Sequence, residues 1–263
     1  MIDDTSKPAL EILQPDWDKI CPTNVDALMT LRAGGVSSGP FGDKTGVGGF
    51  NVGAYCGDVD FCVKMNRQLA SQLVPSDPKW LKQVHGTTVV DAEDAAPEVE
   101  ADASTSVTPG VVCVVQVADC LPVLIPEKTG KAVAAVHCGW RSLADGILQK
   151  TIARLNERLG GDHNYIAWMG PRIGDEDFET GVEVLDAMQK YLPNAQEAFK
   201  SVGEGKYLAS LTGLATQALS QVGVTEVVKA RHSTYANADL FYSFRRDGKT
   251  GRHAAMIWIK GEA

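Results

Sequence analysis

The stretch from Val111 to Trp140, VVCVVQVADCLPVLIPEKTGKAVAAVHCGW, contains the pattern that decides the fold. Val111–Val117 is a run of β-branched residues typical of a buried strand. Two further apolar runs, Pro122–Ile125 and Ala132–Val136, flank the segment Glu127–Gly130, which has turn chemistry. The sequence therefore predicts three successive buried strands, and the last two form a hairpin.

After Gly139 the apolar spacing changes from that of a strand to that of a helix. Apolar residues recur every three or four positions from Leu143 to Leu155. The remaining patterns predict strands at 25–32, 80–90 (two short strands broken at Gly86), 165–170, 226–230 and 254–259, and helices at 58–74, 181–191 and 207–221. Asp58 or Asp60 is expected to cap the first of these helices. Strands and helices alternate along the whole chain, which favours a layered α/β domain with a mixed sheet.

The composition is that of one large globular domain. The chain has 263 residues, of which 44% are hydrophobic and 22% charged. Because no composition shift looks like a linker, we expect one domain over 1–263. The opening stretch to Asn24 contains Pro8, Pro15 and Pro22, which predicts irregular structure there.

The charge and the cysteines limit the partners and the location. The formal net charge of −8 gives no general attraction for nucleic acid or anionic lipid, so neither is an expected partner. No apolar run reaches the roughly 18 residues that span a bilayer, and the N-terminus lacks signal-peptide features. We therefore expect a cytoplasmic protein whose six cysteines, which form no CxxC pair, are free thiols.

The hairpin predicts two ligands of one metal ion. If Glu127–Gly130 is a four-residue loop, Cys120 lies opposite His137, and facing residues of a hairpin have Cβ atoms about 4.5–5.5 Å apart. A five-residue loop would instead place the two side chains on opposite faces. His85, at the rim of another expected strand, is the natural third ligand, although the sequence does not place it beside the other two.

This ligand set leaves several chemistries open. Two imidazoles and a thiolate suit zinc with a fourth position open for water, and they also suit a blue-copper site. A multicopper oxidase is disfavoured, because the chain has five histidines and no His-x-His pair. A thiol hydrolase dyad of Cys120 and His137, assisted by Asp119 or Gln83, is a rival. The plainest interpretation is that Cys120 and His137 are structural.

Arginines near the C-terminus suggest an anion-binding site. The segment Phe244–Arg252 holds four cations, among them Arg245 and Arg246, and such a group binds phosphate or carboxylate well. The alternative is a solvated hairpin turn at Asp247-Gly248. Arg32 and Asn51, at either end of a glycine-rich loop at 34–53, are weaker candidates for ligand contacts.

These segments together resemble the laccase-domain family, also called the YfiH-type or polyphenol-oxidase family. The matching segments run in family order over almost the whole chain: Leu31–Ser38, Phe50–Gly53, Asn66-Arg67, Lys82–Gly86, Ala118–Leu124, Val136–Arg141, Gly170–Gly174 and Phe241–Arg252. Two departures are Val117 in place of the usual threonine, and Cys138-Gly139-Trp140-Arg141-Ser142 in place of Ala-Gly-Trp-Arg-Gly. Neither removes a proposed ligand, but both could alter substrate preference.

The resemblance implies a three-layer αβα fold with mixed sheets and a zinc site at His85, Cys120 and His137. It implies ligand contacts by Arg32, Asn51, Gln83, Arg245 and Arg246, and we add Asp119 as an acid/base candidate because it adjoins Cys120. The implied activity is phosphorolysis of adenosine, inosine or methylthioadenosine, with adenosine deaminase activity besides. The alternatives are a copper-dependent polyphenol oxidase, an amide hydrolase that edits peptidoglycan precursors, and a metal-stabilised binding module. Monomer and weak dimer remain open.

Overall fold

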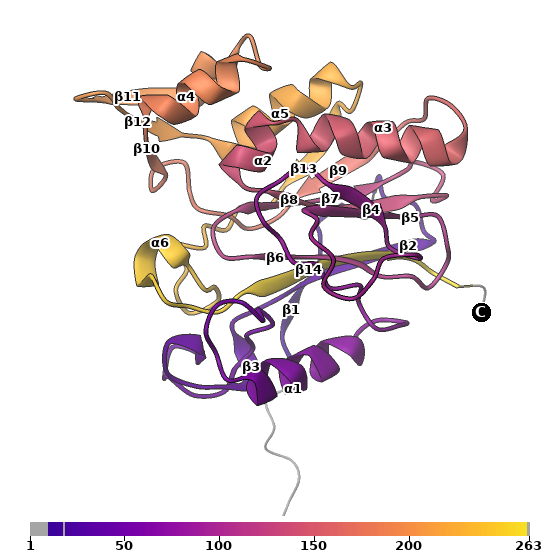
Figure 1. The fold of residues 1–263 in the computed structure, drawn as a ribbon, viewed down its shortest axis with the longest axis vertical. Coiled ribbons are helices and arrows are strands. Elements are labelled where there is room, and N and C mark those ends of the chain that lie inside the picture. The colour runs from indigo at the N-terminus through magenta and orange to yellow at the C-terminus, as the bar shows by residue number, and fades with distance from the viewer. Residues whose placement is uncertain (1–9, 18, 262–263) are drawn as a thin grey trace, which may run out of the picture.

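Two β-sheets are stacked face to face between layers of helices in the computed structural model, which describes residues 10–17 and 19–261 (Figure 1). The six-stranded sheet is mixed and has the order β13-β9-β7-β8-β5-β4, with the bounds Glu226–Lys229, Ile166–Met169, Leu121–Pro126, Val133–Cys138, Ala103–Ser106 and Val89–Asp91. The four-stranded antiparallel sheet has the order β1-β2-β14-β6, with the bounds Ile12–Leu13, Val25–Thr30, His253–Ile259 and Cys113–Val117. The expected mixed α/β class is confirmed, and its β layer consists of two sheets.

The helices cover the outer faces of this double layer. The larger sheet carries α2 (Trp140–Ala144), α3 (Ile147–Leu159), α4 (Val182–Gln189) and α5 (Leu211–Gln221) on its outer side, and α1 (Asp60–Ser71) covers the smaller sheet (Figure 1). A three-stranded sheet lies beside α4, with the order β10-β12-β11 and the bounds Glu179–Gly181, Lys206–Ala209 and Phe199–Gly203. The short elements are β3 (Ala33–Ser37), α6 (Phe244–Asp247) and two 3-10 turns at Gly39–Phe41 and Ala195–Ala198. Among the described residues, no helix is both long and apolar enough to cross a membrane.

Period-two alternation along the strands builds three cores. On β14, Ala255 and Ile257 pack between the two sheets, whereas Met256 faces the core under α1. On β8, Val133 and Ala135 face the inter-sheet core, and Ala134 and Val136 belong to the core under α2 and α3. Residues at odd positions of β8, including His137, therefore point into the space between the sheets.

The hairpin of β7 and β8 forms, but its expected register is wrong by two residues. Pro126 pairs with Val133 and His137 pairs with Pro122, because the connection is longer than the four-residue loop expected. Continuing this register by one pair places Cys120 opposite Gly139. A shift of two residues keeps each side chain on its face, so Cys120 and His137 still share one face as diagonal neighbours.

Several local expectations are corrected. The first of two strands expected within Trp80–Val90 is absent from the described structure, where Lys79 and Lys82 make only isolated bridges. The cap of α1 is Val59 and not an aspartate; Asp58 accepts a hydrogen bond from the Val59 amide at 2.7 Å. The helix expected after Gly139 is broken into α2 and α3 at Gly146, whose φ is 81°.

Three further expectations need adjustment. The turn at Asp247-Gly248 is the end of the helical turn α6 and not a hairpin. The glycine-rich loop contains the strand β3. The expected irregular N-terminus contains the two-residue strand β1, while 1–9 and 18 lie outside the described residues.

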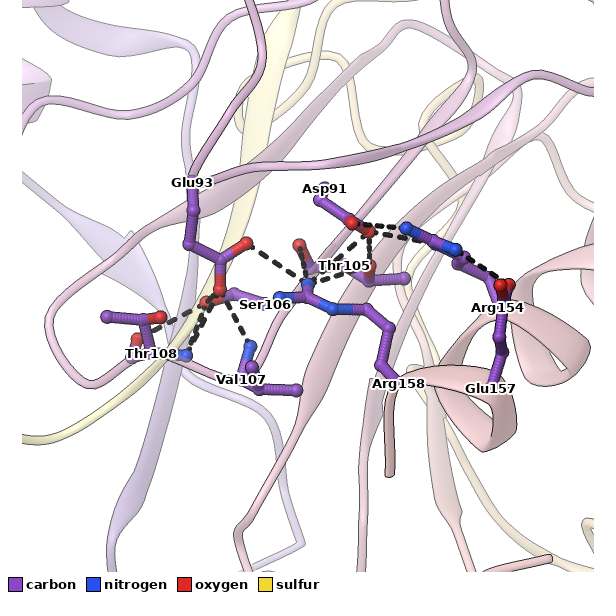
Figure 2. Close-up of polar contacts among 9 residues, drawn as sticks. All are labelled: Asp91, Glu93, Thr105, Ser106, Val107, Thr108, Arg154, Glu157 and Arg158. Carbon is purple, nitrogen blue, oxygen red and sulfur yellow. Dashed lines mark hydrogen bonds and ion pairs between the residues drawn. The ribbon is translucent and has the colours of Figure 1, made fainter. Parts of the chain in front are cut away.

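Ion pairs fasten α3 to the edge of the larger sheet (Figure 2). Arg154 pairs with Asp91, and Arg158 contacts Asp91 at 3.4 Å and Glu93 at 3.1 Å. Glu93 also accepts hydrogen bonds from the Ser106 hydroxyl at 2.8 Å and the Val107 amide at 2.9 Å. Burial raises the pKa of Glu93, but the bonds from Arg158, Ser106 and Val107 outweigh it and lower the pKa to about 2.

We expect Glu93→Gln to lower the free energy of unfolding by about 1–3 kcal/mol near neutral pH, because it removes the charge that faces Arg158. The folded pKa is about 2 and the ordinary value is 4.5, so this stabilisation is complete above about pH 5 and disappears as the pH falls towards 2. Urea unfolding at several pH values measures the difference between variant and wild type.

Glu226→Gln is the matched control, because it removes a carboxylate from the exposed ion pair with Lys128. Its effect should be about 0–1 kcal/mol. A cost for Glu93→Gln that is the same at low and neutral pH would contradict the role assigned to its charge.

Candidate metal centre

Three side chains from separate parts of the chain meet at one end of the space between the sheets. The potential ligand atoms of His85, Cys120 and His137 all lie within 4.8 Å of one another. Cys120 Sγ is 3.6 Å from His85 Nε2, and the two imidazole rings are 4.8 Å apart at an angle of 73°. Tetrahedral zinc with ordinary Zn–S and Zn–N bonds separates such a sulfur and nitrogen by about 3.5 Å. The ligand set therefore fits zinc.

Each side chain reaches the site by a different local structure. His137 is in β8, and Cys120 immediately precedes β7, so the hairpin brings these two together. His85 lies in the irregular segment before β4 and has a φ of 59°, a strained left-handed conformation for a non-glycine residue. The third position is therefore held by tertiary contacts.

The carboxylate of Asp102 provides those contacts. It is fully buried and accepts hydrogen bonds from the backbone amides of His85 at 3.0 Å and Gly86 at 2.7 Å. It also accepts the Nδ1 hydrogen of His137 at 2.8 Å, which leaves His137 Nε2 directed to the site. A carboxylate in this position fixes the tautomer and orientation of a ligating histidine. One side chain therefore orients two of the three candidate ligands.

The same contacts shift the pKa values of the cluster. Burial raises the pKa of Cys120, but the charge of His137 and hydrogen bonds from both histidines lower it to about 6. Burial lowers the pKa of His137, but Cys120 and Asp102 raise it to about 9. Asp102 has a lowered pKa because its bonds to His137 and the backbone amides outweigh its burial. Both shifts favour a thiolate beside an imidazolium, and a histidine must lose its proton to bind a metal through that nitrogen.

Gly139 makes room for the cluster. A Cβ at this position would lie 2.5 Å from His85 Cδ2 and 3.4 Å from Cys120 Sγ. Its φ of −66° is open to any residue, so glycine is needed here for space and not for backbone freedom.

The carboxylate of Asp119 is engaged in hydrogen bonds within the protein, unlike an acid/base group that faces a substrate. Its carboxylate accepts hydrogen bonds from the Thr234 hydroxyl at 2.6 Å, the Ser243 hydroxyl at 3.0 Å and the Arg245 amide at 2.7 Å. Its φ of 85° turns the chain just before Cys120. The structure thus gives Asp119 a positioning role: it joins the cysteine to the C-terminal segment.

The cluster opens into a cavity of about 410 Å³. Its walls come from the glycine-rich loop (Gly53, Tyr55, Cys56), the segment before β4 (Leu81, Gln83, His85), the β6–β7 region (Gln116, Val117, Ala118, Cys120), β8 (His137), the start of α2 (Arg141) and the C-terminal segment (Phe244, Arg252). Among the described residues that line it, two are arginines and none is a carboxylate. In a chain of net charge −8, this is a locally positive cavity.

Of the ligand contacts predicted from sequence, only Gln83 lines this cavity. Its side-chain nitrogen donates to the Gln116 carbonyl at 2.8 Å, and its side-chain oxygen accepts from the Gln116 amide at 2.6 Å. Arg32 bonds the carbonyls of Gly42 and Ala238. Asn51 is buried and accepts hydrogen bonds from the amides of Gly53 and Arg252. These side chains hold the walls of the cavity in place.

Arg245 and Arg246 also bond backbone carbonyls: Arg245 contacts Asp177 and Glu179, and Arg246 contacts Thr234, Tyr235 and Phe241. The two arginines that do line the cavity, Arg141 and Arg252, were not among the predicted contacts. Both lie in the segments quoted for the family resemblance, and Arg252 is also the last of the four cations in the segment Phe244–Arg252. Asp102 lies in an acidic, turn-rich stretch and has no such indication.

A model of the family described as "Multi-copper polyphenol oxidoreductase laccase" matches residues 26–260. The chain belongs to this laccase family. Its relatives within the family include a Haemophilus influenzae protein named purine nucleoside phosphorylase, 38% identical over 255 residues, covering 95% of this chain and 100% of the relative. Another is Escherichia coli YfiH, also named purine nucleoside phosphorylase, 41% identical over 253 residues, covering 95% and 99%.

Solved structures share the laccase-family fold. A Neisseria meningitidis protein is 42% identical and superposes with a TM-score of 0.86 over 95% of this chain and 99% of its own. YlmD from Geobacillus stearothermophilus is 26% identical with a TM-score of 0.82, over 91% and 93%.

We expect Asp102→Asn to weaken zinc binding about 10- to 100-fold, because an amide does not hold the His137 tautomer as a carboxylate does. Competition with a chromophoric chelator measures the affinity. Asp186→Asn, at an exposed position of α4, is the control and should leave the affinity unchanged. An Asp102→Asn protein that is folded and binds zinc as tightly as wild type would contradict this role.

Proposed function

We propose that this protein is a metal-dependent purine nucleoside phosphorylase that accepts adenosine, inosine and methylthioadenosine. The names of relatives that match nearly the whole chain support this proposal. The observation that carries it is the cavity, where a cluster able to hold zinc and two arginines meet without any carboxylate among the described lining residues. A nucleoside and an inorganic anion are the ligands that such a cavity would accept together.

Arg141 and Arg252 are the groups that we assign to phosphate. Arg141 is exposed at the start of α2 and stacks on its neighbour Trp140 at 4.3 Å, with no ion pair to another described residue. Arg252 donates from one nitrogen to the carbonyls of Thr250 and Gly251, at 2.9 and 3.0 Å, so its other nitrogens remain available to a ligand. Guanidinium groups bind phosphate through charge-assisted hydrogen bonds.

In phosphorolysis a phosphate oxygen forms a bond to the ribose anomeric carbon while the bond from that carbon to the base nitrogen breaks. The electron pair of the broken bond remains on the base, which is then protonated. The arginines would hold the attacking phosphate next to the nucleoside, and bound reactants gain rate through proximity and orientation. His85, Cys120 and His137 would hold zinc, which when bound supplies a Lewis acid to polarise a substrate atom.

The proposal includes adenosine deaminase activity, which hydrolyses the amino group from C6 of the purine. The two-histidine, one-cysteine set supports it, because such a set leaves a position for water. A multicopper oxidase is disfavoured, because the described residues bring together one group of metal-capable side chains, whereas such an oxidase needs several.

We expect zinc-loaded protein to release adenine from adenosine only when phosphate is present, and to form some inosine without it. His85→Ala should lose both activities, because it removes a ligand of the proposed metal. Chromatography of the products measures both reactions. Wild-type protein that yields neither product from adenosine, inosine or methylthioadenosine would overturn the proposal.

We expect Arg141→Met to raise the KM for phosphate about tenfold or more, because it removes charge-assisted hydrogen bonds that contribute about 1.5–3 kcal/mol. Arg252→Met should act in the same direction, and the KM for the nucleoside should change less in both. Arg231→Met removes an exposed cation outside this cavity and controls for net charge. A phosphate KM that responds equally to all three variants would indicate only a general charge effect.

A further inference from the structure

Two large aromatic side chains that line the cavity are exposed to solvent, although most of their surface is apolar. Tyr55 is 64% exposed and Phe244 is 58% exposed, yet both belong to the cavity wall next to the candidate metal centre. Apolar side chains left open in a concave site are typical of ligand-binding surfaces. Two exposed aromatic rings in a cavity wall suit a ligand with a flat apolar face.

The backbone of each residue is held by neighbouring hydrogen bonds, while its ring remains largely exposed. Phe244 lies between Ser243 and Arg245, which both donate to the carboxylate of Asp119, the neighbour of Cys120. Tyr55 precedes Cys56, whose thiol bonds the carbonyl of Gly53 at 3.1 Å. No hydrogen bond to the Tyr55 hydroxyl occurs among the described residues. These hydrogen bonds therefore fix where the two residues lie relative to the metal cluster.

The two amide side chains in this wall, those of Gln83 and Gln116, already bond the backbone. Gln83 exchanges both ends of its amide with the backbone of Gln116, and the Gln116 side chain donates to the carbonyl of Leu81 at 3.2 Å. A planar heterocycle therefore meets ring faces here more readily than free amide groups. Cations lie over both rings, with Lys82 Nζ 6.0 Å from Tyr55 and Arg252 5.7 Å from Phe244.

We propose that Tyr55 and Phe244 form the base-binding part of the cavity and bind the purine by stacking on its face, without reading its edge. This inference rests on the proposed function for the identity of the ring. Stacking of a base on an aromatic side chain contributes about 1–3 kcal/mol. Because 6-amino and 6-oxo purines present similar faces, loss of either aromatic ring weakens binding of both to a similar extent.

The test is calorimetric titration of zinc-loaded protein with adenine and with hypoxanthine. Tyr55→Leu and Phe244→Leu should each raise the dissociation constant about 5- to 150-fold for both bases, the range that corresponds to the stacking energy. Tyr55→Phe and Phe244→Tyr keep the ring and should remain within a few-fold of wild type. Tyr191→Leu, at a residue 56% exposed and outside this cavity, is the matched control.

Steady-state kinetics separates this inference from the proposed function. If wild type turns over nucleosides, the leucine variants should raise the nucleoside KM more than the phosphate KM. If wild type shows no turnover, the proposed function fails, and the titrations alone decide the stacking site. Leucine variants that bind both bases as tightly as wild type, or that lose only one base, overturn the proposal.

Discussion

The buried carboxylate of Asp102 holds the candidate site together. It accepts the Nδ1 hydrogen of His137 and the amides of the segment that carries His85, while the main-chain carbonyl of Asp102 accepts the amide of His137. Such a carboxylate is costly to bury, and its charge is compensated by these donors. The Asp102 carboxylate anchors the left-handed backbone at His85. It also fixes the tautomer of His137, so both imidazoles lie beside Cys120.

Asp119 has the corresponding role on the other side of the site. Its carboxylate gathers Thr234, Ser243 and the amide of Arg245, so the C-terminal segment is fastened to the residue beside Cys120. The same segment carries Phe244 and Arg252 into the cavity wall. Two buried carboxylates that do not line the cavity therefore position groups that do, and no carboxylate occurs among the described lining residues. This arrangement suits an anionic co-substrate in a protein that is acidic elsewhere.

Local patterns predicted most of the framework, and the errors have physical causes. The apolar runs located β6, β7 and β8. The expected metal site at the hairpin and the family segments both indicated His85, Cys120 and His137, which the structure places together. The register of the hairpin was wrong because turn chemistry does not define how far pairing continues past the turn, and here the connection extends to Ala132. The error did not separate Cys120 from His137, because a two-residue shift preserves the face of each strand.

The sequence by itself determined the alternation of strands and helices, the mixed α/β class and the residue types able to hold a metal, because periodicity and turn chemistry act over short distances along the chain. Only the tertiary structure decided which polar side chains face the cavity. Arg245, Arg246, Arg32 and Asn51 look like ligand contacts in the sequence, but they satisfy backbone groups that would otherwise lack partners. Arg141, Arg252, Tyr55 and Phe244 line the cavity because distant segments meet there. Hydrogen-bond partners far apart in sequence make that selection, and no local pattern encodes it.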